Sequence, residues 1–355
     1  MTLRVLHVTE ALGGGVQSAI ANYVDELDDV DHTIFARDRA GQSTSEWPTR
    51  VRRESYSGSL PGFFVRLVGK VRQEHPDVVH LHSSFAGVAR AVLPHCDGLV
   101  YSPHCYAMER RDVRRPVRWA FAAAEFLLAR RRQAIVAVSP REASISERLN
   151  HHNPAVVVLN PSPWEGSART AFPSTVPEVV MVGRIQAQKD PQLFAAVARA
   201  ARPGPWRFVW VGDGDPQGRA ELESAGVEVT GWLPPDIVRQ RLAAASLYLH
   251  TAAWEGGPVS TIEAAALGLP VIARGIPSMR SLGYPPAGEN PEELAYAVRR
   301  FFDEPGLAAS VARASASIAD EATRPAMAAA LRQAYASAIS TPRHGRARRA
   351  RYGTG

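Results

Sequence analysis

The chain has 355 residues, of which 45% are hydrophobic and 21% charged, and its formal net charge is +6. This length exceeds what one ordinary hydrophobic core supports, and the composition is that of a globular protein rather than a disordered or membrane-spanning one. The two cysteines exclude a disulfide framework and favour a reducing, cytoplasmic compartment. No run approaches the roughly 18 apolar residues of a membrane-spanning helix.

Short apolar strands alternate with helices through the first half of the chain. Residues 2–10 predict a buried strand and lack the charged and apolar regions of a secretory signal peptide. Later strands are predicted in P-D-V-V-H-L-H, G-L-V-Y-S-P-H, Q-A-I-V-A-V-S and A-V-V-V-L-N. This alternation indicates a doubly wound parallel sheet, which we assign to an N-terminal domain over residues 1–163.

The strand ends of this half carry a glycine loop and three histidines. Gly14 and Gly15 lie in A-L-G-G-G-V-Q-S-A, where a helix begins, although the G-x-G-x-x-G spacing of a dinucleotide site is absent. His80, His82 and His104 fall at or near strand ends, the edge where open α/β sheets bind ligands. His104 is the most exposed candidate. No metal-ligand spacing accompanies the three histidines, so we expect no metal there.

Two segments are strongly basic. Residues 109–132 predict an amphipathic helix in which eight arginines alternate with aromatic and aliphatic residues, and residues 342–355 form a basic tail that we expect to be disordered. Such segments can attract an anionic membrane surface or a polyanion. The alternative is a solvated helix face and an inert tail.

Residues 164–176 are rich in Pro, Ser and Thr and predict a linker, after which the strand–helix alternation restarts. We assign residues 177–322 to a second doubly wound domain and residues 323–341 to a C-terminal helix that returns to the first domain. Two such domains imply a cleft bordered by the carboxyl ends of both sets of strands.

The first loop of the second half suits an anion. In V-G-R-I-Q-A-Q-K-D-P, Gly183 and Arg184 follow a strand, and Lys189 precedes a helix that Asp190 is expected to cap. A lysine at a helix N-terminus opposes the helix dipole, and an anion bound by Arg184 and Lys189 would remove that conflict. Pairing of these cations with nearby carboxylates is the alternative.

The next loop, V-G-D-G-D-P, places Gly212 after a strand and contains two carboxylates. Asp213 and Asp215 could hold a divalent ion on a diphosphate. A strand followed by Gly-x-Gly-x-Pro is also an ordinary tight turn, and we favour the turn.

Residues 254–273, W-E-G-G-P-V-S-T-I-E-A-A-A-L-G-L-P-V-I-A, combine two carboxylates with a glycine pair. Gly256 and Gly257 would let a ligand approach the backbone closely, and Pro258 suits the first helical turn. Glu263 lies on an apolar helix face, where an unpaired carboxylate is costly. Its partner could be an arginine in a structural ion pair or the hydroxyl groups of a ligand.

Together these motifs resemble the family 4 glycosyltransferases, which have the GT-B fold of two Rossmann-like domains. The resemblance covers roughly residues 3 to 340 and rests on G-R-I-Q-A-Q-K-D, V-G-D-G-D-P, the Gly231–Trp232 strand exit and the two glutamates separated by seven residues in 254–273. It implies a retaining, metal-independent enzyme that moves a sugar from a nucleoside-diphosphate sugar to a sugar or lipid-linked acceptor in polysaccharide or glycolipid biosynthesis.

The resemblance also implies roles for individual residues. The expected catalytic residues are His104, Arg184, Lys189 and Glu255, and the expected donor-binding residues are Gly14, Gly15, Gly183, Gly212, Trp232, Gly256, Gly257, Pro258 and Glu263. Arg184 and Lys189 would hold the donor diphosphate. Glu255 would hold sugar hydroxyls and Glu263 the ribose, while His104 would lie beside the sugar.

Two other hypotheses remain open. One is a metal-dependent transferase that uses Asp213 and Asp215, and the other is a catalytically inactive module that binds a nucleotide sugar. The Gly-Gly-Pro after the first glutamate departs from the family pattern and is expected to alter which sugar fits. Expected partners are a nucleotide sugar, a glycan or lipid-linked acceptor and an anionic membrane surface, with no nucleic acid. We expect a cytoplasmic protein, peripheral on the inner membrane face.

Overall fold

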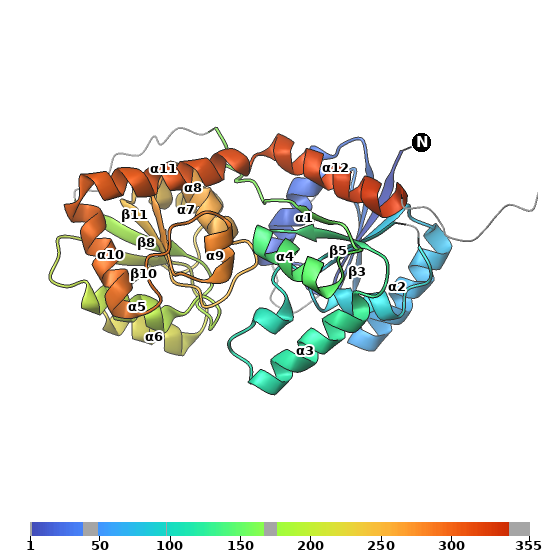
Figure 1. Cartoon of the computed structure of the whole chain (residues 1–355), viewed down its shortest axis with the longest axis horizontal. Helices are drawn as coiled ribbons and strands as arrows, with labels where there is room; N and C mark the ends of the chain where they lie inside the picture. The colour runs from blue at the N-terminus through green and yellow to red at the C-terminus, as the bar shows by residue number, and fades with distance from the viewer. Residues whose placement is uncertain (1, 38–48, 97, 167–175, 341–355) are drawn as a thin grey trace, which may run out of the picture.

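The computed structural model describes residues 2–37, 49–96, 98–166 and 176–340. Two α/β lobes lie side by side, each built on one parallel sheet with helices packed around it (Figure 1). The predicted fold class is confirmed. Most of the predicted linker at 164–176 and the entire segment from 341 onward lie outside the described residues.

The N-terminal lobe contains a seven-stranded sheet. Its strands are β1 (Arg4–Thr9), β2 (Asp31–Arg37), β3 (Arg52–Tyr56), β4 (Val78–His82), β5 (Gly98–Ser102), β6 (Ala134–Ala137) and β7 (Ala155–Val157). Its helices are α1 (Gly14–Glu26), α2 (Leu60–Glu74), α3 (Arg115–Leu128) and α4 (Pro140–Leu149), with short 3-10 helices η1 (Ala86–Ala91) and η2 (Ala107–Glu109).

The strand order of this sheet is β3-β2-β1-β4-β5-β6-β7, and every pair is parallel. The central strands β1, β4 and β5 are apolar and buried, as their sequences predict. β2 and β3 were not predicted. β3 is the polar stretch R-R-E-S-Y at the sheet edge, where one side of a strand stays in water and apolar alternation is not required.

The C-terminal lobe contains a five-stranded sheet. Its strands are β8 (Glu178–Val182), β9 (Arg207–Val211), β10 (Glu228–Val229), β11 (Leu247–His250) and β12 (Val271–Ala273). Its helices are α5 (Pro191–Ala200), α6 (Pro216–Ser224), α7 (Pro235–Ala244), α8 (Val259–Ala266), α9 (Pro277–Ser281), α10 (Pro291–Asp303) and α11 (Pro305–Glu321). The strand order is β10-β9-β8-β11-β12, again all parallel.

The last helix, α12 (Arg324–Ser340), leaves the C-terminal lobe and packs on the N-terminal one (Figure 1). Leu331 and Tyr335 of α12 are buried in one cluster with Val5 of β1 and Val136 of β6. The hydroxyl of Tyr335 also bonds to His80 of β4. The core of the N-terminal lobe is therefore completed by residues from the far end of the chain.

α3 is attached to its lobe by a buried ion pair rather than by an apolar face. Glu125 is its one buried residue, and this carboxylate accepts hydrogen bonds from Arg90 of η1 at 2.7 Å and from the Tyr101 hydroxyl at 2.8 Å. The Arg90 guanidinium also stacks on the Tyr101 ring. Among the helices that the structure describes, none is long and apolar enough to cross a membrane.

Replacing Glu125 with alanine is expected to lower the free energy of unfolding by about 3–5 kcal/mol, because Arg90 would be left buried without its counter-charge. Urea or guanidinium denaturation measures this loss. The exposed pair of Arg199 and Glu221 is the control, since Glu221→Ala should cost less than about 1 kcal/mol. Equal effects at the two sites would contradict the buried-pair explanation.

Candidate functional site

A cavity of about 1180 Å³ lies between the two lobes. Arg111 and Arg141 line it from the N-terminal lobe, and Asp190, Trp254 and Arg274 line it from the C-terminal lobe. Arg141 pairs with Glu109 in its own lobe, and Arg274 pairs with Asp190. Gly183, Arg184 and Lys189 lie on the loop after β8, and Glu255 lies on the loop after β11, at positions next to the residues that line this cavity.

The loop after β8 meets the loop after β11 through an ion pair. Lys189 Nζ lies 2.5 Å from Glu255 Oε1, and Gln188 Nε2 donates to Glu255 Oε2 at 3.1 Å. Glu255 is buried, and His250 Nε2 lies 3.7 Å from its Oε1. Both ring nitrogens of His250 are buried without a hydrogen-bond partner, and burial together with the charge of Lys189 lowers the pKa of His250 well below its usual value. Lys189 thus has a carboxylate partner, and an anion bound here would share it.

Arg184 differs from Lys189 in its surroundings. It is exposed, and its guanidinium carbon lies 5.9 Å from the ring centroid of Trp232. No carboxylate pairs with Arg184 within the described parts of the chain. Gly183 and Gly212 allow the loops beneath it to touch, since a Cβ on Gly212 would lie 2.2 Å from the Gly183 carbonyl oxygen.

The aspartates of V-G-D-G-D-P have structural partners. Asp215 caps α6 by accepting from the backbone N–H of Gly218 at 2.7 Å, and Asp213 pairs with Arg219 at 3.0 Å. Both contacts are those of a turn that starts a helix, which favours the turn interpretation over the metal interpretation.

Glu263 lies in the first turns of α8 and is partly buried. Burial raises the pKa of its carboxyl group to about 7, and the charge of Lys189 opposes that shift. No hydrogen bond or ion pair of this carboxylate is found among the residues described, so the alternative of a structural ion pair gains no support. The N-termini of α1 and α8 meet nearby, because a Cβ on Gly15 would lie 3.9 Å from Val259.

Gly256 and Gly257 have a different neighbour from the expected one. A Cβ on Gly257 would lie 2.3 Å from the Val138 carbonyl oxygen, and one on Gly256 would lie 2.6 Å from the Cys105 nitrogen. Both contacts cross from one lobe to the other. In this structure the glycine pair therefore accommodates the backbone of the N-terminal lobe, whereas the sequence suggested a close ligand.

His104 lies in a strained loop after β5. His104 and Cys105 both have left-handed backbones, with φ of 48° and 87°, which non-glycine residues seldom adopt without support from surrounding structure. Glu142 supplies that support by accepting from the N–H of Cys105 at 2.5 Å and of Val138 at 3.0 Å. Burial raises the pKa of Glu142 to about 7. The sequence analysis missed Glu142, because its S-P-R-E context indicates only a helix cap.

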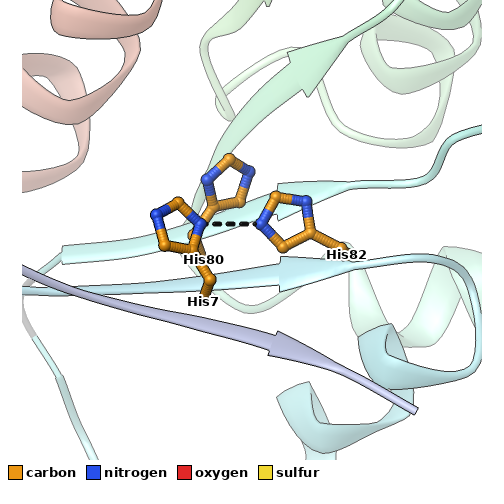
Figure 2. A group of neighbouring side chains, drawn as sticks. All are labelled: His7, His80 and His82. Atoms are coloured by element: carbon orange, nitrogen blue, oxygen red, sulfur yellow. Dashed lines mark hydrogen bonds between the residues drawn. The ribbon is translucent and has the colours of Figure 1, made fainter. Parts of the chain in front are cut away.

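His80 and His82 do not line the cleft as expected. Both rings are inaccessible to solvent within the sheet, because helices cover both of its faces. They lie with His7 of β1, and nitrogens of the three rings fall within 4.8 Å of one another (Figure 2). His7 was not singled out from the sequence, since the H-V-T context of β1 is that of any buried strand.

Two family models match the chain. The glycosyl transferases group 1 model matches residues 176–304, and the glycosyltransferase family 4 model matches residues 13–162. An uncharacterised 41.2 kDa protein in the cps region of Klebsiella pneumoniae is 24% identical over 300 residues, 78% of this chain and 82% of that protein. The Escherichia coli UDP-Gal:alpha-D-GlcNAc-diphosphoundecaprenol alpha-1,3-galactosyltransferase is 23% identical over 264 residues, 64% of this chain and 65% of that enzyme.

A solved structure shares the fold. Anabaena Alr3699/HepE in complex with UDP-glucose has a TM-score of 0.71 at 16% identity, over 94% of this chain and 100% of that one. The two family matches together span both lobes and most of the predicted site. The chain therefore belongs to the family 4 glycosyltransferases and is an enzyme that transfers a sugar.

Proposed function

We propose that this enzyme transfers a sugar, with retention of configuration, from a nucleoside-diphosphate sugar to a glycan or lipid-linked acceptor at an anionic membrane surface. The observation that carries the donor assignment is the arrangement around Glu263. The Glu263 carboxylate, which has no hydrogen bond or ion pair among the described residues, lies near the charge of Lys189 and in the first turns of α8, whose N-terminus meets that of α1.

Diphosphate binding is supported by positive groups that both lobes contribute where they meet. The N-termini of α1 and α8 each present free backbone N–H groups and a positive dipole end, which suits an anion. Arg184 has no carboxylate partner among the residues described. A phosphate oxygen bound beside Lys189 would share its ammonium group with Glu255, which keeps this buried carboxylate paired.

The carboxylates suit the hydroxyl-bearing parts of the donor. Glu263 in its ionised form offers only acceptors, and ribose hydroxyls offer the matching donors. Glu255 already accepts one hydrogen bond from Lys189 and one from Gln188, so its orientation towards a sugar is set before binding. The Anabaena complex contains UDP-glucose, which makes uridine donors the first to test.

The reaction follows from this placement. The bond between the anomeric carbon and the diphosphate oxygen breaks, and its electron pair leaves with the diphosphate. Arg184 and Lys189 offset the charge that grows there. The acceptor oxygen bonds to the same face of the anomeric carbon, and its proton passes to the departing phosphate oxygen. No protein nucleophile is required by these steps.

Membrane docking is supported by the outer surface of α3. Trp119, Phe126 and Leu127 are 70%, 48% and 58% exposed, although they are large apolar residues. Arg114 and Arg115 are exposed at the start of the same helix. An exposed apolar stripe flanked by arginines matches an anionic bilayer surface, where aromatic rings enter the interface and arginines meet phosphates. The E. coli relative acts on an undecaprenol-linked diphosphate, a membrane acceptor.

Lys189→Met is expected to weaken binding of nucleoside diphosphates at least tenfold, because a charge-assisted contact to phosphate is lost. Thermal shift with UDP, GDP and ADP measures this. A ligand at about 100 times its Kd stabilises the native state by about 2.7 kcal/mol, so the wild-type shift is readily seen. Arg241→Met, which removes an exposed ion pair with Glu228, should leave the shift intact. No wild-type shift with any nucleotide would refute the donor assignment.

Glu263→Gln is expected to raise the melting temperature of the unliganded enzyme at pH 8 and to weaken donor binding. The folded-state pKa of about 7 lies above the usual 4.5, so ionisation of Glu263 costs stability as pH rises from 4.5 to 7, and the cost is full above pH 7. Glutamine avoids it. The melting temperatures of Glu263→Gln and wild type should therefore become equal near pH 4.5. Scanning calorimetry across pH measures this, and a destabilised variant at pH 8 would show that Glu263 has a protein partner.

Trp119→Ser combined with Phe126→Ser is expected to abolish flotation with anionic liposomes, because the apolar anchor of α3 is removed. Wild type should float with anionic vesicles and remain behind with neutral ones. Tyr296→Ser is the control, since Tyr296 is 57% exposed on α10 of the other lobe. Flotation of wild type with neutral and anionic vesicles alike would contradict the charge-matched docking.

A further inference from the structure

Four histidines form a continuous hydrogen-bonded chain through the N-terminal sheet. His32 Nδ1 lies 3.0 Å from His7 Nε2, and His7 Nδ1 lies 3.0 Å from His82 Nε2, the contact drawn in Figure 2. His82 Nδ1 lies 3.1 Å from His104 Nε2. The first three rings are inaccessible to solvent, and His104 is partly exposed at the other end.

The inner end of this histidine chain bonds to a group that can only accept. His32 Nε2 lies 3.0 Å from the Leu27 carbonyl oxygen, so this nitrogen must carry a proton. A neutral imidazole carries one proton, and His32 Nδ1 must then accept from His7 Nε2–H. The same reasoning repeats at His82 and at His104. Every ring is protonated on Nε2, and His104 Nδ1 keeps its lone pair.

The rings are neutral at physiological pH. Burial lowers the pKa of His7 and His82 well below the usual value, and it lowers the pKa of His104 to about 4. The pKa of His32 is also lowered, again mainly by burial. Each ring therefore carries a single proton, as the assignment of the Nε2 protons requires.

A metal site is the competing explanation for the group of His7, His80 and His82. Each of their ring nitrogens already has a partner. His80 bonds through Nδ1 to the Tyr335 hydroxyl at 3.1 Å and through Nε2 to Ser102 Oγ at 2.8 Å. A metal ion would have to replace such bonds inside a closed core, so hydrogen bonding accounts for the group as it stands.

We propose that His32, His7 and His82 are positioning residues that hold His104 with its lone pair on Nδ1, as an acceptor for a hydroxyl of the donor sugar. The proposal rests on the proposed function and on the role that the family resemblance implies for His104, which is to lie beside the donor sugar. Within the described residues no hydrogen bond to His104 Nδ1 is found. Glu142 holds the backbone of the same loop through Cys105, so ring and backbone are oriented from two sides.

The tautomer of His104 can be measured without any substrate. Two-bond ¹⁵N–¹H correlation spectra of the full chain at pH 7 distinguish a protonated from an unprotonated ring nitrogen. We expect Nε2 protonated and Nδ1 unprotonated in all four rings. A protonated Nδ1 on wild-type His104, or a shift of these resonances on addition of Zn²⁺, would overturn the proposal whatever the enzyme transfers.

Three variants distinguish a role of the histidines in positioning His104 from a role in packing the core. His7→Leu interrupts the histidine chain and should allow the second tautomer of His104, with kcat lowered on the order of fivefold, the factor of one net hydrogen bond. His7→Gln offers one donor and one acceptor and should restore both the tautomer and the rate. His80→Leu removes a buried histidine outside the chain and should leave the tautomer of His104 unchanged.

The outcomes distinguish the positioning role of the histidines from the proposed function of the enzyme. A rate that falls in His7→Leu while the His104 tautomer stays as in wild type would mean a purely structural role and would overturn the inference. If His7→Leu does not fold, the comparison of wild type with His7→Gln still tests the positioning role. Both proteins must show the same His104 tautomer, and a different tautomer in His7→Gln would contradict it. Absence of transfer with every donor would refute the proposed function, and the tautomer measurement would stand by itself.

Discussion

The two lobes meet backbone to backbone at Gly256 and Gly257, and the geometry of the whole cleft depends on that contact. A side chain at either position would collide with Cys105 or Val138 of the opposite lobe. The glycine pair thereby sets the distance between the loop that carries His104 and the start of α8. The same approach brings the N-termini of α1 and α8 together, so the positive ends of two helices face one another. An anion between them offsets a repulsion that the fold itself creates.

Several buried ionisable groups that cost stability lie at this junction, and the apolar cores of the two lobes offset that cost. Glu142 and Glu263 are carboxyl groups with raised pKa values, and His250 is buried with neither ring nitrogen bonded. Behind them, each lobe has a large apolar core formed by its sheet and the helices that cover it. Pre-organised polar groups held in a dry site act on a reaction without first having to reorganise. The cost in stability is consistent with a site arranged for a bound ligand.

The parts of the fold that follow local rules were predictable from the sequence. Asp190 caps α5 as expected, and α8 gives way to β12 across Gly268, because both features depend on a few neighbouring residues. The contacts of the site were less predictable. The reason for Gly256 and Gly257 lies more than a hundred residues away in sequence, and the role of Glu142 depends on the conformation of a distant loop. Hydrogen bonds among His7, His32 and His82 require strand order, which periodicity does not reveal.

The return of α12 to the N-terminal lobe has a consequence for synthesis. Leu331 and Tyr335 fill the core beside β1 and β6, so the first lobe cannot complete its core until the second lobe and α12 have been made. The lobe that is translated first must then wait, with apolar strands partly uncovered, while the second lobe folds completely. A pause of the ribosome between the two lobes would leave exposed the apolar surface that α12 later covers, and such a surface is prone to aggregate.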